Sequence, residues 1–121
     1  MKYETRGNAA WLTFDRPEKA NALAPETLKD METLLGRAED DGVRAVVLTG
    51  AGEKFCAGAD IDAVASAEEE EARGFAESIA NVLHSIETLE VPVLSAVNGD
   101  AYGAGFETVI ASDLAVATEG A

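Results

Sequence analysis

Several residue types are scarce in this sequence, and each scarcity excludes a class of protein. The chain has one cysteine, Cys56, which cannot form an internal disulfide and therefore suits a reducing, cytoplasmic location. It has one histidine, His84, and no cluster of residues at metal-ligand spacing, so no metal site is expected. No apolar run approaches the roughly 20 residues that cross a bilayer, and the first residues do not form a secretory signal. A membrane partner is therefore not expected.

Basic residues are scarce too. Four lysines and five arginines stand against 23 aspartates and glutamates, which gives a formal net charge of −14. A surface this acidic repels phosphate, so nucleic acid is excluded as a partner. It also repels itself at low ionic strength, and salt relieves this repulsion, with a Debye length of about 3 Å at 1 M. We therefore expect a protein of the halophilic type, with an ordinary acidic protein as the alternative.

The length and composition of the chain are typical of one globular domain. The 121 residues suffice for a modest core, and 47% hydrophobic with 26% charged residues is a globular composition. Strands and helices are expected to alternate, which predicts an α/β fold with parallel strands and, by pattern alone, a doubly wound sheet. The expected strands cover 3–6 and 11–14 (a hairpin), 43–49, 93–97 and 114–118; the expected helices run from about Pro25 to Gly42, from a capping box at Ser66–Glu69 to Pro92, and over 105–112.

A glycine-rich loop, Gly50-Ala51-Gly52, follows the strand expected at 43–49 and begins like a dinucleotide-binding motif. Phe55 replaces the third glycine and no helix begins there, so a nucleotide cofactor is not expected. Cys56 lies just beyond this loop, but a thiol nucleophile needs a neighbouring base or positive field. The only histidine, His84, is 28 residues away in an expected long helix. The sequence therefore favours a packed, structural cysteine.

Two segments rich in small residues, 55–61 and 98–107, are better candidates for a ligand site. Small residues let a ligand approach the backbone, and the first amides of a helix have no acceptor within it. Ala104 would offer such an amide at the positive end of the helix dipole. Glu107 follows three residues later on the same helical face, where a carboxylate suits catalysis better than anion binding. The alternative is that the glycines only permit close packing and that Glu107 is an exposed surface residue.

Three blocks of the chain together resemble the crotonase family, also called the enoyl-CoA hydratase/isomerase superfamily. They are Leu12–Leu23 (Leu-Thr-Phe-Asp-Arg-Pro-Glu-Lys-Ala-Asn-Ala-Leu), Val46–Ile61 and Pro92–Leu114, in the order and at the spacing of the family. The resemblance implies a spiral of ββα turns that forms two roughly perpendicular sheets, in place of a doubly wound sheet. It also implies that residues 1–121 are the N-terminal part of a single crotonase-like domain, whose full-length form assembles as a homotrimer or hexamer.

The same resemblance implies roles for residues in these blocks. The backbone amides of Ala59 and Ala104 would form an oxyanion hole for a thioester oxygen, and Glu107 would act as acid and base. Many relatives have glycine where this chain has Ala104, a difference that keeps the amide. Coenzyme A would enter as part of the substrate, so no separate cofactor is expected. The residues that would receive it are Lys19, Ala20, Ala22, Ala57, Asp60, Ile61 and Gly103.

The activity implied by the resemblance is addition of water to a short or medium 2-enoyl-CoA, an acyl-CoA thioester. Hydratases of the family use two glutamates around a water; Glu107 matches the first, and the second falls beyond Ala121. Lys19 and Lys54 are candidate partners of the CoA phosphates, or else ordinary surface lysines. Two other functions stay open: an enoyl-CoA isomerase with the same oxyanion hole, and a non-catalytic coenzyme A-binding fragment, because the second carboxylate is absent.

Overall fold

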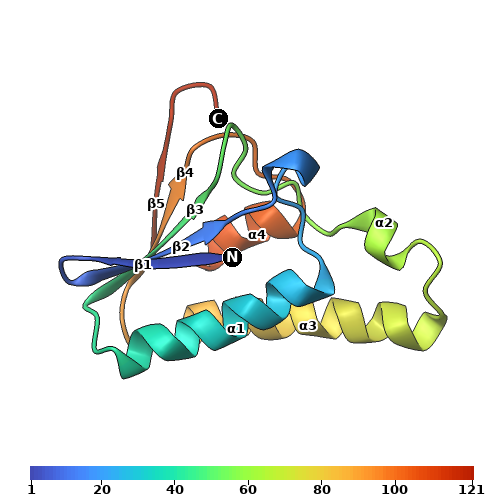
Figure 1. The fold of residues 1–121 in the computed structure, drawn as a ribbon, viewed down its shortest axis with the longest axis horizontal. Coiled ribbons are helices and arrows are strands. Elements are labelled where there is room, and N and C mark those ends of the chain that lie inside the picture. Colours follow the sequence, from blue (N-terminus) through green and yellow to red (C-terminus); the bar gives the residue numbers. More distant parts are fainter.

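In the computed structural model, which describes all residues from 1 to 121, five strands form one sheet (Figure 1). The strands are β1 (Lys2–Arg6), β2 (Ala9–Phe14), β3 (Ala45–Gly50), β4 (Val93–Val97) and β5 (Leu114–Ala117), and they lie in this order across the sheet. β1 and β2 pair antiparallel as the expected hairpin. Every other neighbouring pair is parallel, as the alternation of strands and helices predicted.

The helices connect the parallel strands. They are α1 (Pro25–Asp40), α2 (Ile61–Val64), α3 (Glu69–Thr88) and α4 (Ala104–Ala111), with a 3-10 turn, η1, at Pro17–Lys19. Strand order follows sequence order and crossovers between parallel strands are right-handed, so successive helices fall on one face of the sheet. Figure 1 shows α1, α3 and α4 together on that side. The doubly wound sheet predicted from the pattern alone is therefore wrong, because it requires a reversal of strand order. None of the helices is both long and apolar enough to span a membrane.

Between each long strand and the helix after it, the chain forms a short extended segment. Two isolated parallel bridges, Leu23 with Ala59 and Cys56 with Ala101, join these segments side by side. Each turn of the chain is thus a long strand, a short paired segment and a helix. This is the ββα spiral that the family resemblance implied, with the second sheet present only as isolated bridges.

The core lies between the sheet and the helices. β2 alternates, with Leu12 and Phe14 buried and the residues between them half-buried. α1 buries one stripe at helical spacing, and α3 adds Val82 and Ile86, which confirms the apolar faces expected of both helices. The Phe14 ring meets the Phe55 ring edge to face, with centroids 5.4 Å apart. Phe55 thereby anchors the start of the segment that leads to Ala59.

The start of α3 differs from the sequence expectation. The pattern predicts a capping box at Ser66–Glu69, but Glu68 is the N-cap of α3 and no side chain caps the helix. Asp60 instead caps the short helix α2, where its Oδ1 accepts a hydrogen bond from Ala63 N at 3.3 Å. Because one helical turn has already formed in α2, the chain bends before α3 begins, and Ser66 lies in that bend.

Close backbone contact between α4 and the segment after β3 requires glycine at position 105. A Cβ on Gly105 would lie 2.3 Å from the carbonyl oxygen of Cys56. We expect Gly105→Ala to lower the free energy of unfolding by about 1–3 kcal/mol, the usual cost of overpacking. Gly74→Ala is the matched control, because a Cβ on Gly74 in α3 would meet nothing within 4 Å and should stabilise the helix by about 0.5–1 kcal/mol. Urea unfolding measures both, and equal stabilities would contradict the contact.

The acidic surface carries few ion pairs. Most of the 23 acidic side chains have no basic partner within 4.0 Å. We propose that this surface is salt-adapted and expect the melting temperature to rise between low and molar KCl, because screening weakens repulsion between carboxylates. Each kcal/mol gained would raise Tm by about 4 °C in a chain of this size. A melting temperature independent of KCl would reduce the charge to an ordinary acidic composition.

Candidate functional site

A cavity of about 360 Å³ beside α2 brings the predicted binding residues together. Five of the seven residues predicted to receive coenzyme A line it, although they come from two distant parts of the sequence. Of the other two, Ala20 accepts a backbone hydrogen bond from Ala57 at 3.0 Å, and Gly103 precedes α4. The complete lining is Lys19, Ala22, Ala57, Ala59, Asp60, Ile61 and Asp62.

The paired segments determine where the amide of Ala59 points. Leu23 N donates to Gly58 O at 2.7 Å, and Asp60 N donates to Leu23 O at 2.9 Å. Neighbouring residues in an extended chain direct their amides to opposite sides, so Ala59 N–H points away from Leu23. On that other side lies the segment that leads into α4. Ala59 N–H has no hydrogen-bond acceptor in the structure, and the residue is exposed.

The second predicted amide belongs to Ala104, the first residue of α4. The first amides of a helix have no acceptor within it, and Ala104 N–H has none elsewhere in the structure. Gly103, at the N-cap, adopts φ 52° and ψ −125°, a conformation open to glycine. A Cβ on Gly58 would lie 3.4 Å from Ala104 N. The residue before Ala59 thus lies against the Ala104 amide, so the two free amides belong to backbone segments in direct contact.

Asp60 is held by other protein groups. Its Oδ2 accepts a hydrogen bond from the Arg16 guanidinium at 3.0 Å, and its Oδ1 accepts one from Ala63 N at 3.3 Å. Burial raises the pKa of the Asp60 carboxyl, but these hydrogen bonds and the charge of Arg16 outweigh it and hold the pKa below its usual range. Arg16 also donates to Ala22 O at 2.8 Å. Arg16, which sequence reasoning did not single out, therefore fixes two parts of the cavity wall.

The two candidate lysines differ in their freedom to meet a phosphate. Lys54 donates a hydrogen bond to Asp100. This bond and the charges of the pair raise the pKa of Lys54 and lower that of Asp100. Lys19 lies at the rim of the cavity with its side chain exposed and its Nζ 4.0 Å from Asp62. Lys19 is thus the more available of the two cations.

Glu107 lies on the outer side of α4. The buried side of this helix consists of Ala104, Gly105 and Thr108, and Thr108 Oγ1 donates to Ala104 O at 2.9 Å. Glu107 is exposed and does not belong to this buried side. Three residues turn the helix by about 300°, which brings Glu107 to the edge of that face. Its carboxylate makes no hydrogen bond or ion pair and is accessible to a ligand.

Cys56 lies in the middle of this region, but its thiol is not activated as a nucleophile. Its side chain is completely buried, and burial raises the pKa of the thiol to about 11. At neutral pH the thiolate is therefore rare, which confirms the packed, structural cysteine that the sequence favoured. No group of three or more His, Cys, Asp or Glu side chains lies close enough together to hold a metal ion.

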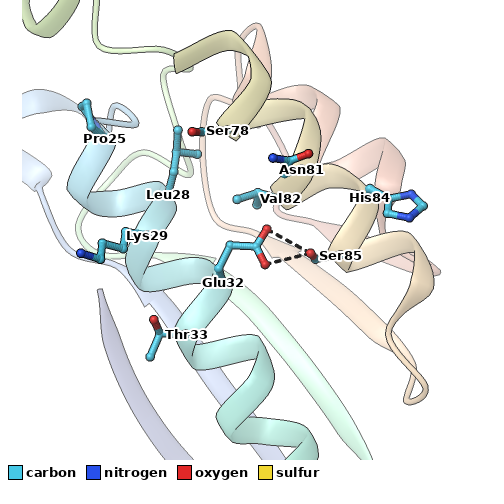
Figure 2. Close-up of a pocket in the computed structure, with 10 residues that line it drawn as sticks. All are labelled: Pro25, Leu28, Lys29, Glu32, Thr33, Ser78, Asn81, Val82, His84 and Ser85. Carbon is cyan, nitrogen blue, oxygen red and sulfur yellow. Dashed lines mark hydrogen bonds between the residues drawn. The ribbon is translucent and has the colours of Figure 1, made fainter. Parts of the chain in front are cut away.

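A larger cavity, of about 680 Å³, lies between α1 and α3 (Figure 2). Most of its lining is polar, with Leu28 and Val82 as the apolar contribution. Ser85 Oγ lies 2.9 and 3.0 Å from the two carboxylate oxygens of Glu32 and donates to them, whereas His84 points outward from α3. None of its lining residues belongs to the cavity beside α2. The candidate site is therefore the smaller cavity, next to the free amides.

Two asparagines were missed by sequence reasoning. Asn21 and Asn98 hold the loop after β3 through side-chain hydrogen bonds to its backbone. Their partners lie 30 to 48 residues away in the sequence, so no local pattern marked these bonds. Asn21 also has φ 60°, in the left-handed region that asparagine enters more readily than most residues.

Known proteins are similar to this chain in sequence and in fold. A family model described as Enoyl-CoA hydratase/isomerase matches residues 4–121. The chain is 43% identical to a short-chain-enoyl-CoA hydratase of Clostridium acetobutylicum, over 98% of this chain and 46% of that protein. It is 39% identical to a carnitinyl-CoA dehydratase of Proteus mirabilis, over 97% of this chain and 45% of that protein. The crystal structure of an enoyl-CoA hydratase from Bacillus anthracis matches with a TM-score of 0.94 at 35% identity, over 99% of this chain and 48% of that one.

The chain thus spans about half the length of the curated relatives it matches. The close structural match confirms the crotonase-like α/β fold of the N-terminal half that the three sequence blocks implied. With 118 of its 121 residues inside the family match, the chain belongs to the enoyl-CoA hydratase/isomerase family, the crotonases.

Proposed function

We propose that this chain binds the thioester of a 2-enoyl-CoA and supports addition of water to its double bond. The observation that carries the proposal is the pair of free amides, Ala59 N–H and Ala104 N–H, on contacting segments beside the cavity. The names of two relatives, at 43% and 39% identity, support the reaction class: one is a hydratase and the other a dehydratase.

In this proposal the two amides bind the thioester oxygen. When water adds to the β-carbon, negative charge moves onto that oxygen, and donors already aimed at it stabilise the enolate. Loss of one such donor typically costs about 3 kcal/mol of transition-state stabilisation. Glu107 takes the proton of the attacking water, and the α-carbon receives a proton through the pair of carboxylates. By the family resemblance, the second carboxylate would come from the part of the relatives' length that this chain does not span.

The cavity beside α2 is the proposed receptor for the coenzyme A part of the substrate. Ala22 and Ala57 present small side chains there, which lets adenine and pantetheine approach the backbone. Lys19 is the exposed cation at its rim, and a chain of net charge −14 has few others to offer a phosphate. In this arrangement Asp60 acts through its bonds to Arg16 and α2, as a support of the cavity wall.

Two alternative functions can be compared with this proposal through particular features of the site. An enoyl-CoA isomerase would use the same two amides, because its reaction also passes through an enolate. Glu107 favours hydration over that alternative, because the family resemblance matches it to the first of the two hydratase glutamates. A non-catalytic coenzyme A-binding role would need only the cavity and the amides, and it would not need the second carboxylate that the family resemblance implies.

We further propose that the full-length protein is a cytoplasmic homotrimer or hexamer. α4 and β5 expose Phe106, Ile110, Leu114 and Val116, each more than half accessible to solvent. Apolar surface of this kind is usually covered by another segment or another subunit. The single cysteine supports a reducing compartment.

We expect residues 1–121 alone to hydrate crotonyl-CoA far below ordinary enzyme rates, because Glu107 would lack its partner carboxylate. Joined to the second half of the Clostridium acetobutylicum hydratase, as a fusion protein, the chain should hydrate crotonyl-CoA. Loss of the enoyl thioester absorbance measures the rate.

The outcomes separate the candidate functions. A fusion protein that moves the double bond of a 3-enoyl-CoA but adds no water would favour the isomerase. One that binds crotonyl-CoA without turnover would favour the binding role. Turnover by residues 1–121 alone at ordinary enzyme rates would contradict the need for a second carboxylate.

A further inference from the structure

The loop Gly50–Lys54 joins β3 to the segment that carries Ala59, and side chains from two other turns of the spiral hold it. Asn21 comes from the first turn, and its Nδ2 donates to the carbonyl oxygens of Ala51 and Lys54, both at 2.9 Å. Its Oδ1 accepts a backbone N–H of its own turn at 2.9 Å. The side chain is buried with all its polar atoms bonded, so it is fixed in place.

Asn98 holds the same loop from the third turn, at the start of the segment that leads to Ala104. Its Nδ2 donates to Gly50 O at 2.8 Å, to Gly52 O at 3.0 Å and to Lys54 O at 3.3 Å. Its Oδ1 accepts a hydrogen bond from Gly50 N at 3.0 Å. The carbonyl of Lys54 therefore accepts hydrogen bonds from both asparagines.

We infer that Asn21 and Asn98 are positioning residues that set the relative placement of the two oxyanion amides. Their shared partner, the Lys54 carbonyl, stands just before the segment that ends at Ala59, and Asn98 begins the segment that ends at Ala104. They therefore fix the three turns against one another at the points where each leaves its long strand. This inference rests on the proposed function of the amides.

The hydrogen bonds from Asn21 and Asn98 to the loop Gly50–Lys54 require an amide side chain. At Asn98, one NH₂ group meets backbone carbonyls while the oxygen meets a backbone N–H. Asparagine is the smallest side chain that offers two N–H donors and a carbonyl acceptor together. An aspartate of the same shape would direct a carboxylate oxygen at those carbonyls and repel them. Asn98→Asp is therefore the sharpest change available.

The test uses residues 1–121 and crotonyl-CoA carrying ¹³C at its thioester carbonyl. A carbonyl that accepts hydrogen bonds stretches at lower frequency, so infrared difference spectra of the bound probe report the two amides directly. We expect a downshift with the wild-type chain and loss of most of it in Asn98→Asp. The Kd should rise by no more than about fivefold, the equivalent of one neutral hydrogen bond. Asn81→Asp, exposed on α3, adds the same charge away from the site and should keep the downshift.

The results test the oxyanion site and the positioning role of the asparagines separately. A wild-type chain that binds the probe without a downshift would remove the oxyanion site and this inference with it. A downshift preserved in Asn98→Asp would overturn the positioning role alone. Because Asn98→Asp can fail to fold, Asn98→Ser is measured in parallel, with circular dichroism as the check on folding. A hydroxyl reaches fewer of the carbonyls, so a smaller loss of the downshift is expected. If neither variant folds, Asn98 serves the stability of the fold alone, and the inference is overturned.

Discussion

Glu107→Gln should lower turnover of crotonyl-CoA in the fusion protein by about 10²- to 10⁴-fold, the usual contribution of a general acid–base group. Glutamine keeps the size of glutamate and can hydrogen-bond a water, but it cannot take or return a proton. Glu107 is exposed and makes no hydrogen bond or ion pair through its side chain, so the fold should be unaffected. The loss should therefore appear in kcat and hardly in KM.

Glu77→Gln is the control for the lost charge. Glu77 is exposed on another helix, α3, and its replacement removes one negative charge without touching the candidate site. Its turnover should match that of the unchanged fusion protein. If Glu107→Gln also kept most of its turnover, the acid–base group would lie elsewhere, and the isomerase or the non-catalytic role would gain support.

Local patterns predicted the elements well because each depends on residues close in sequence. The hairpin of β1 and β2 follows from two β-type runs around Gly7, and the apolar stripe of α1 follows from helical spacing. The winding of the sheet could not be obtained in this way. A singly wound and a doubly wound sheet have the same alternation of strands and helices and differ in strand order, which depends on contacts between turns. Only the resemblance to a family supplied that information.

The residues of the candidate site also differ in how far the sequence could predict them. The amide of Ala104 could be named because it opens an expected helix, whereas the amide of Ala59 was implied only by the family resemblance. In the structure, positive-φ glycines stand directly before both, at Gly58 and Gly103. The hydrogen bonds from Asn21 to the loop could not be predicted, because its partners are carbonyl oxygens 30 and 33 residues away. Carbonyl groups are present at every residue, so no sequence pattern marks the ones that a side chain will meet.

Ala104→Pro should lower turnover of the fusion protein by about 10²- to 10³-fold, because proline removes one donor of the proposed oxyanion hole. The helix tolerates the change, since Ala104 is the first residue of α4 and its N–H makes no bond within the protein. Gly103, with φ 52° and ψ −125°, lies outside the α region that proline disfavours in the preceding residue. The variant thus deletes the amide hydrogen and places the ring Cδ where that hydrogen stood.

Ala104→Gly is the matched control, because it shortens the side chain but keeps the amide, and it should retain most of the turnover. The comparison also separates two roles for the amide. If it stabilises the enolate, Ala104→Pro should slow exchange of the α-proton of a bound acyl-CoA with solvent as well as hydration, because both reactions place charge on the thioester oxygen. If hydration falls and the exchange does not, the amide places the attacking water instead. Equal turnover of Ala104→Pro and Ala104→Gly would remove this amide from the reaction and leave Ala59 N–H as the sole proposed donor.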